Sequence, residues 1–198
     1  MIVVVRHGRT AHNASGRLLG RIDPELDEVG LEQASALALA VGPVDRVITS
    51  PLLRTRQTAA AFARDVEVDE RWIELDYGEY DGVPLGEVGP EVWARWRSDL
   101  EFTPPGGESL RQLGGRVRAA LEDLAAEEVA RAEAGGAERT TVVVTHVSPV
   151  KAAVGWALGV DDEVSWRLWV APASITRIAA TARGGVLHTF NEIAHLAT

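Results

Sequence analysis

The stretch Ile2-Val3-Val4-Val5-Arg6-His7-Gly8-Arg9-Thr10 decides how this chain is organised. Four consecutive β-branched apolar residues predict a fully buried strand. A guanidinium and an imidazole follow directly, so we expect both at the carboxyl end of that strand. In open α/β sheets, this end borders the crevice that binds ligands. Arginine grips phosphate or carboxylate through paired hydrogen bonds, and histidine titrates near neutral pH or acts as a nucleophile.

Length and composition limit the class of protein. The chain has 198 residues, of which 46% are hydrophobic, and it has no cysteine. We therefore expect one domain over residues 1–198, without disulfides or thiolate metal sites. No apolar run approaches the roughly 20 residues needed to cross a bilayer. The first apolar run is too short for a signal peptide, so a cytoplasmic location is the expectation.

The charge is acidic overall but unevenly distributed. A formal net charge of −9 argues against broad binding to nucleic acid or to membrane surfaces. Residues 1–22 and 46–64 nevertheless contain no Asp or Glu and four arginines each. These two basic segments predict a local anion site. Their arginines are Arg6, Arg9, Arg17 and Arg21, and Arg46, Arg54, Arg56 and Arg64.

Strand and helix patterns alternate along the chain. This alternation predicts an α/β fold, a three-layer α/β/α sandwich around a mostly parallel sheet. Ser50-Pro51 and Ser148-Pro149 each predict an N-cap followed by proline at the first helical position. Strands are predicted at residues 2–5, 44–49, 66–68, 141–145, 175–180 and 186–190, and helices at residues 28–41, 51–64, 88–100, 110–134 and 149–158.

Three predicted strands end in the same kind of polar segment. One ends at Arg6 and His7, the second at Ser50 with Arg54 in the next helical turn, and the third at His146. Parallel strands would bring these ends to one edge of the sheet, where helix N-termini also attract anions. Each residue alone fits an ordinary ion pair or a structural histidine. Together they predict a site for a dianion, with phosphate as the natural occupant.

Several segments, in this order, resemble the signature of the histidine phosphatase superfamily, which has the phosphoglycerate mutase-like fold. The resemblance runs from about residue 1 to residue 196 and implies that fold with a small cap insertion. The segments are Arg6-His7-Gly8-Arg9-Thr10 with Asn13, Ser50-Pro51-Leu52 with Arg54-Thr55 and Gln57-Thr58-Ala59, Glu74-Leu75-Asp76-Tyr77-Gly78, Pro105-Gly106-Gly107-Glu108-Ser109, and Val144-Thr145-His146.

The resemblance implies a covalent mechanism. His7 would attack phosphorus and become phosphohistidine. Glu74 would protonate the leaving alkoxide and then deprotonate the water that attacks the phosphohistidine. The resemblance implies no metal and no cofactor, and the chain contains neither a His-Glu-x-x-His motif nor a Walker loop. Positive side chains would do the work of Mg²⁺.

The same resemblance implies the residues that bind the transferred phosphate. Arg6, Arg54 and His146 would hold its equatorial oxygens, where charge spreads in the transition state. Asn13 would donate a further hydrogen bond, and Val147 would contribute its backbone N–H. Val147 stands where glycine is common in the family.

Two further positions depart from the family pattern. Arg9 stands where Glu or Gln is common, and His12 stands where Trp is common. These departures leave the substrate preference open more than the chemistry. Arg9 either adds positive charge at the mouth of the site or is exposed and irrelevant.

We expect a metal-independent phosphomonoesterase that acts on a small phosphorylated metabolite and releases inorganic phosphate. The first alternative is a cofactor-dependent phosphoglycerate mutase-type phosphotransfer. Mutases of the family are generally longer and carry a basic insertion, whereas Arg71, Arg95 and Arg97 are the only basic residues between positions 64 and 107. The second alternative is a catalytically silent phosphate-binding module, which the presence of all the expected catalytic residues does not support.

Residues 79–107 are expected to form the cap that sets specificity. Tyr80, Trp93 and Trp96 would either wall the substrate or, as we favour, pack the cap's own small core. The sequence of residues 145–151 is most similar to that of the α-ribazole phosphatase-like and broad acid-phosphatase members of the superfamily. The physiological substrate, residual mutase activity and the choice between monomer and homodimer stay open.

Overall fold

The computed structural model describes residues 1–196 of the chain. A single six-stranded sheet runs through it in the order β3-β2-β4-β1-β5-β6. The first four strands along the chain are parallel to one another, and β5 is antiparallel to both of its neighbours. The strands are β1 (Ile2–Arg6), β2 (Arg46–Thr49), β3 (Val66–Val68), β4 (Thr141–Thr145), β5 (Ile175–Thr181) and β6 (Gly184–Glu192).

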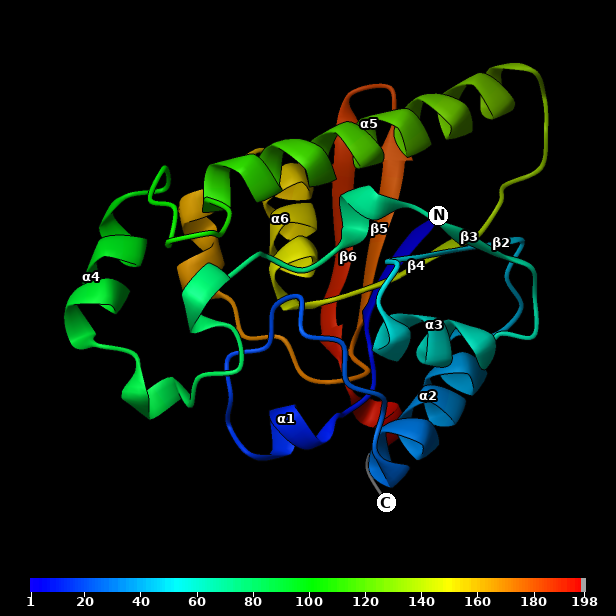
Figure 1. The fold of residues 1–198 in the computed structure, drawn as a ribbon. Coiled ribbons are helices and arrows are strands. Elements are labelled where there is room, and N and C mark those ends of the chain that lie inside the picture. Colours follow the sequence, from blue (N-terminus) through cyan, green and yellow to red (C-terminus); the bar gives the residue numbers. More distant parts are fainter. Residues whose placement is uncertain (197–198) are drawn as a thin grey trace.

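Helices cover both faces of this sheet, which confirms the predicted α/β sandwich (Figure 1). The predicted bounds of α2 are confirmed, and its N-cap is Asp27, whose Oδ1 accepts the Gly30 N–H at 2.8 Å. The helices are α1 (Ala11–Ala14), α2 (Glu28–Val41), α3 (Leu53–Ala60), α4 (Pro90–Ser98), α5 (Leu110–Glu133) and α6 (Val147–Leu158).

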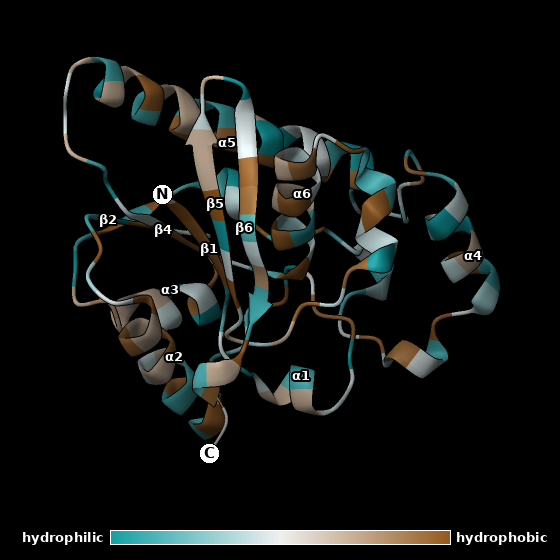
Figure 2. Cartoon of the chain, turned by 180° about the vertical axis from the view of Figure 1, so that it is seen from behind, coloured by the Kyte–Doolittle hydropathy of each residue, from teal (hydrophilic) through white to brown (hydrophobic). Residues whose placement is uncertain are grey.

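The alternation of side chains along β1 separates two hydrophobic cores. Val3 and Val5 pack toward α2 and α3, and Ile2 and Val4 pack toward α5 and α6. Successive side chains of a strand point to opposite faces, so a strand covered on both sides must be apolar throughout. Figure 2 shows this apolar strand between the two helical layers. The first five residues therefore commit the chain to three layers.

The ends of three strands meet at one edge of the sheet. In the register of the parallel pairs, Arg6 lies opposite Thr145, and Thr49 lies opposite Val144. The residues that follow these strands, His7, Ser50 and His146, are therefore neighbours. This confirms the expected convergence of strand ends.

Both predicted Ser-Pro helix starts are wrong. The α3 helix begins at Leu53 with Leu52 as its N-cap, so Ser50 lies before the helix. The Ser50 Oγ lies 2.8 Å from His146 Nε2 and accepts the Leu52 N–H at 3.4 Å. The α6 helix begins at Val147, so Ser148-Pro149 lies inside its first turn. Proline is tolerated there because the first amides of a helix have no intrahelical acceptor.

Residues 79–107 contain α4 and contribute to a third, smaller core. This core contains Leu18, Val88 and Trp96, and α4 lies to one side of the sandwich (Figure 1). Trp96 is only 1% exposed and stacks edge-on against Tyr77 and Tyr80. Trp96 therefore packs a core, as we favour, but residues outside 79–107 such as Leu18 complete this core, and Trp96 also lines the cavity described below.

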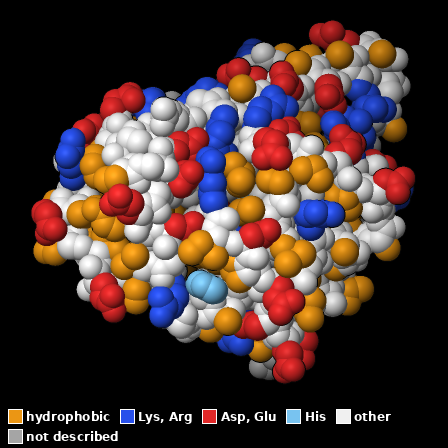
Figure 3. All heavy atoms as spheres, in the orientation of Figure 1, with side chains coloured by type: hydrophobic (Ala, Val, Ile, Leu, Met, Phe, Trp, Pro, Cys, Tyr) orange, Lys and Arg blue, Asp and Glu red, His pale blue; other side chains and the backbone are white. Residues whose placement is uncertain are grey.

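The surface charges and the hydrophobicity of the helices indicate what the protein can contact. Acidic and basic side chains are interspersed over the face shown in Figure 3. None of the helices in residues 1–196 is long and apolar enough to cross a membrane.

Candidate active site

The His7 ring is held in one orientation at the end of β1. Its Nδ1 lies 2.7 Å from the Gly8 carbonyl oxygen. A carbonyl oxygen only accepts, so Nδ1 carries the proton and Nε2 keeps its lone pair. The turn is held by backbone packing, since a Cβ on Gly8 would lie 2.3 Å from the Gly30 oxygen at the start of α2.

The His146 ring lies beside that of His7. The two ring centroids are 5.1 Å apart with planes at 64°, and both side chains are buried. His146 Nε2 lies 2.8 Å from the Ser50 Oγ. Its Nδ1 is buried without a hydrogen-bond partner among the described residues. Buried polar atoms are rarely left unpaired, so this nitrogen calls for a ligand.

Two guanidinium groups complete the cluster, that of the partly buried Arg6 and that of the buried Arg54. Arg6 donates from Nη1 to the Val170 carbonyl at 2.7 Å. Arg54, with no exposed surface, donates from Nη2 to Gly20 at 2.6 Å and from Nη1 to Ile22 at 2.8 Å. The Nε of each arginine is buried without a partner in the described part of the chain. Both groups therefore retain unused donors.

Burial and the guanidinium charges set the protonation state of the cluster. Desolvation lowers the pKa of both Arg6 and Arg54 to about 10, so both remain cationic at neutral pH. Desolvation, followed by repulsion from Arg54 and then from Arg6, holds the pKa of His7 well below its ordinary value of 6.5. The pKa of His146 is held well below that value by desolvation first and then by Arg54. Both imidazoles are therefore neutral at pH 7.

We expect the ligand-free protein to lose stability as the pH falls below about 6.5. The unfolded histidines take up protons near that pH, and the folded ones do so only at lower pH, so the loss continues as the pH falls through the folded-state pKa values. Each depressed histidine contributes up to about 1.4 kcal/mol per pH unit within that window. Between pH 7.5 and pH 5, the unfolding temperature should fall with decreasing pH, and this fall should be clearly less steep in His146→Gln than in the wild type. The control His188→Gln changes an exposed ring on β6, and a slope equal in all three proteins would contradict the expectation.

Glu74 is buried at 3% exposure, and backbone amides hold its carboxylate. Oε1 accepts the N–H of Leu75 at 2.7 Å and of Ser148 at 3.2 Å, and Oε2 accepts the same Ser148 N–H at 3.3 Å. The segment that carries Glu74 is tied to α5, because Arg116 donates to the carbonyls of Ile73 at 2.7 Å and of Glu74 at 3.2 Å. Sequence reasoning missed Arg116, since a mid-helix arginine carries no local signal.

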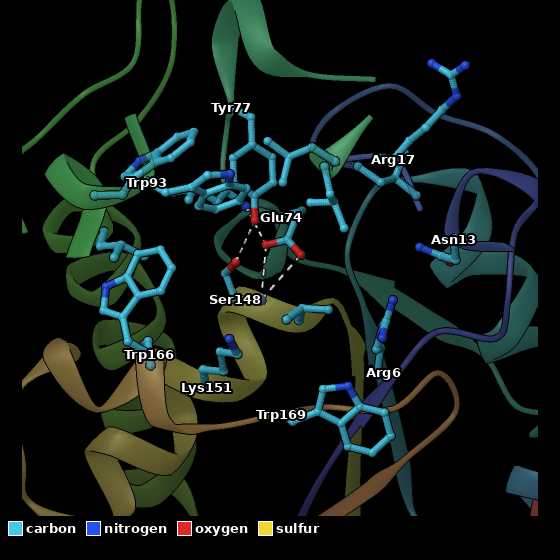
Figure 4. A pocket seen from close by; sticks show the side chains of 18 of the residues that line it. Arg6, Asn13, Arg17, Glu74, Tyr77, Trp93, Ser148, Lys151, Trp166 and Trp169 are labelled. Atoms are coloured by element: carbon cyan, nitrogen blue, oxygen red, sulfur yellow. Dashed lines mark hydrogen bonds between the residues drawn. The ribbon is translucent and has the colours of Figure 1, made fainter. Parts of the chain in front are cut away.

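A cavity of about 470 Å³ opens beside this cluster (Figure 4). Four of the predicted site residues line it: Arg6, Asn13, Glu74 and Val147. His7, Arg54 and His146 do not line it and are buried. His7 and His146 are the chain neighbours of the lining residues Arg6 and Val147. The remaining wall is largely aromatic and apolar, with Leu18, Leu19, Leu75, Tyr77, Leu85, Trp93, Trp96, Leu110, Trp166 and Trp169, and its other lining residues are Gly16, Arg17, Ser148, Lys151 and Ser165.

Asn13 is oriented by the first turn of α1. Its Oδ1 accepts the Thr10 N–H at 3.1 Å and the Thr10 hydroxyl at 3.0 Å. The amide nitrogen at the other end of this side chain is a donor only. Asn13 therefore has N–H groups to offer a ligand in the cavity.

The basic segments as a whole do not form one anion site. Arg9 donates from Nε to Asp27 at 2.8 Å and does not line the cavity. Arg46 begins β2, far along the strand from the site, and pairs with Glu67 and Glu127. Opposite charges brought near by the fold neutralise these arginines. Residues 1–196 hold no group of three or more His, Cys, Asp or Glu side chains that could bind a metal ion.

A model of the histidine phosphatase superfamily (branch 1) matches residues 2–193. The chain belongs to the histidine phosphatase superfamily. A bifunctional protein of Mycobacterium tuberculosis is 35% identical over 185 residues, which cover 88% of this chain and 49% of that protein. The chain thus spans about half the length of the first curated relatives it matches. Phosphoserine phosphatase 1 of Hydrogenobacter thermophilus is 35% identical, over 98% of this chain and 93% of the relative.

Solved structures of the superfamily have the same fold. A mycobacterial glucosyl-3-phosphoglycerate phosphatase in complex with VO3 aligns with a TM-score of 0.85 and 29% identity, over 96% of this chain and 98% of that one. Mycobacterial hydrolase 1 aligns with a TM-score of 0.86 and 29% identity, over 98% of each chain. These similarities confirm the phosphoglycerate mutase-like fold, and two of these relatives are phosphatases by name.

Proposed function

We propose that this histidine phosphatase hydrolyses a small phosphomonoester through a phosphohistidine on His7, without a metal. One observation carries the proposal: the rings of His7 and His146 lie side by side, beside two guanidinium groups whose buried Nε atoms have no partner among the described residues. Such a cluster can balance the negative charge of a phosphate group and donate hydrogen bonds to its oxygens. A mycobacterial relative with this fold forms a complex with VO3, which supports binding of an oxyanion by the fold.

In the first step, the Nε2 lone pair of His7 forms a bond to phosphorus while the bond to the ester oxygen breaks. Glu74, in its protonated form, transfers its proton to that oxygen, so the leaving group departs as an alcohol. Arg6, Arg54 and Nδ1–H of His146 stabilise the charge on the equatorial oxygens. Asn13 and the Val147 N–H donate further hydrogen bonds to the phosphate.

In the second step, a water molecule attacks the phosphohistidine. The Glu74 carboxylate takes one proton from that water as its oxygen bonds to phosphorus. The bond from phosphorus to Nε2 then breaks, and its electron pair returns to His7, which is again neutral. Inorganic phosphate is released, and Glu74 is protonated as at the start.

The test is hydrolysis of p-nitrophenyl phosphate in excess EDTA, with the protein quenched during turnover. We expect nitrophenol release unaffected by the chelator and a phosphoenzyme that is labile to acid and stable to base, as a phosphoramidate is. Binding of phosphate with no turnover of any phosphomonoester would instead identify a silent binding module.

Mutase activity is tested by supplying 3-phosphoglycerate with a 2,3-bisphosphoglycerate primer. We expect phosphate release to exceed formation of 2-phosphoglycerate, since residues 65–107 carry only three basic side chains. Formation of 2-phosphoglycerate faster than phosphate would overturn the phosphatase assignment.

We further propose that residues 1–198 form one domain in which residues 79–107 are a cap over the cavity. Trp93 and Trp96 from α4 line the cavity, and Trp96 joins that lining to the third core. Two of the relatives named above act, by their names, on phosphoserine and on glucosyl-3-phosphoglycerate. A small phosphorylated metabolite of this kind is the substrate class that we propose.

Ser50→Ala is expected to lower kcat/KM for p-nitrophenyl phosphate by about tenfold and to weaken inhibition by phosphate similarly. The Ser50 Oγ lies 2.8 Å from Nε2 of His146. In the proposed mechanism this hydroxyl donates to Nε2, which keeps the proton of the ring on Nδ1 for the phosphate. The control Ser35→Ala removes an exposed hydroxyl on α2 that bonds Leu31. An inhibition constant for phosphate equal to that of the wild type would contradict this positioning role.

A further inference from the structure

Lys151, the only lysine in the chain, lies in the cavity beside the proposed phosphate site. It is half-buried on α6, three residues after Ser148 and four after Val147. Residues three and four apart lie on one face of a helix. Lys151 therefore extends the same face of α6 one turn beyond the amides that meet phosphate and Glu74 (Figure 4).

The Lys151 ammonium is not used within the protein. It forms neither a hydrogen bond nor an ion pair among residues 1–196, and the charges that act on it are those of Glu74 and Arg6. Burial lowers its pKa, since charging the amine in this partly apolar wall costs free energy. The proposed reaction assigns it no step. A half-buried cation without a partner in a ligand cavity is expected to meet its partner on the ligand.

We propose that Lys151 selects phosphomonoesters whose leaving alcohol carries a carboxylate. This inference rests on the proposed function, because the transferred phosphate must first occupy the cluster of His7 and Arg54. The carboxylate would then lie roughly one helical turn, about 5–6 Å, from the phosphate-binding end of α6. Trp93 and Trp166 line the same cavity and lower the local dielectric constant, which strengthens the charge pair.

The number of available charges favours a carboxylate over a second phosphate. Three basic side chains line the cavity within the described chain: Arg6, Arg17 and Lys151. Arg6 serves the transferred phosphate, and Arg17 donates from Nη1 to the Gly82 carbonyl at 2.8 Å. Lys151 is then a single positive charge, which matches one carboxylate and leaves a phosphate dianion incompletely neutralised.

The experiment compares two substrates that differ at one group. They are 3-phosphoglycerate, which carries a carboxylate, and glycerol 3-phosphate, which carries a hydroxymethyl group instead. For Lys151→Met, we expect kcat/KM to fall about 10- to 100-fold for 3-phosphoglycerate, mostly through KM, and less than about threefold for glycerol 3-phosphate. Lys151→Arg keeps the positive charge and should retain most of the preference.

Two controls separate substrate recognition from structural effects. Arg17→Met removes the other cation near the mouth of the cavity and should change both substrates alike. Lys151→Met should unfold at an unchanged or higher temperature, because methionine keeps the apolar stem and removes an unpaired, half-buried charge. A lower unfolding temperature with equal losses on both substrates would show that Lys151 is structural and overturn the inference.

The remaining outcomes distinguish a failure of this inference from a failure of the proposed function. If the wild type hydrolyses both esters equally well, carboxylate selection fails and the phosphatase proposal stands. If Lys151→Met lowers kcat equally for both substrates and shifts the pH profile, Lys151 acts on Glu74 and the inference is overturned. If the wild type hydrolyses neither ester nor p-nitrophenyl phosphate, the proposed function itself fails.

Discussion

His7→Ala is expected to lower kcat/KM for p-nitrophenyl phosphate by about 10⁴-fold or more and to abolish the acid-labile phosphoenzyme. The proposed covalent path has no other group in this place, because Nδ1 of the neighbouring His146 is assigned to bind phosphate and its Nε2 is bonded to Ser50. Removing the nucleophile of a covalent mechanism costs losses of this order in other hydrolases. Steady-state rates and quenched phosphoenzyme measure the two effects.

The control for this variant is His188→Ala, which removes an exposed ring on β6 and should leave the rate unchanged. Because His7 is buried, thermal unfolding and phosphate binding of His7→Ala establish that the fold and the two guanidinium groups persist. A folded His7→Ala protein that keeps more than about 1% of the wild-type rate, with an acid-labile phosphoenzyme, would refute His7 as the nucleophile.

Glu74→Gln is expected to lower kcat/KM by about 10²- to 10⁴-fold for alkyl phosphates and by less than about tenfold for p-nitrophenyl phosphate. An alkoxide is a poor leaving group that needs a proton, whereas nitrophenolate leaves as a stable anion. Glutamine is close in size to Glu74 and offers no carboxyl proton. The measurement must use kcat/KM, which reports the first step, because Glu74 also serves the second step and affects kcat for every substrate.

The matched control is Glu79→Gln, an exposed change five residues further along the same segment, which should affect neither substrate. Equal losses of kcat/KM for alkyl and nitrophenyl esters in Glu74→Gln would contradict its role as an acid. They would indicate that the carboxylate acts by holding the Ser148 amide, to which it is bonded in the structure.

Local patterns were sufficient for most of the fold. The run of apolar residues at 2–5 and the Asp27 cap before α2 are each encoded within a few neighbouring residues, and the structure confirms both. The strand ends at His7, Ser50 and His146 could also be brought together from the sequence. That step needs only the rule that parallel strands end at one edge of a sheet.

Other features depend on partners distant in the chain, and sequence reasoning missed them. The Ser50-Pro51 pattern fits a helix cap, but α3 begins at Leu53, and the Ser50 hydroxyl lies 2.8 Å from His146, 96 residues away. Arg9 and Arg46 belong to basic segments, yet folding places acidic partners beside them. No pattern in the neighbouring sequence marks Lys151. Only the tertiary structure shows that it lines the cavity and that its charge has no partner among residues 1–196.

The sequence by itself determined the layers, the edge at which the site forms and the residue types gathered there, because periodicity, caps and strand ends are short-range properties. Only the tertiary structure decided which of those charges remain unpaired, which nitrogen of each histidine is free and what lines the cavity. These properties follow from side-chain burial and hydrogen bonding between distant segments, and no spacing along the chain encodes them.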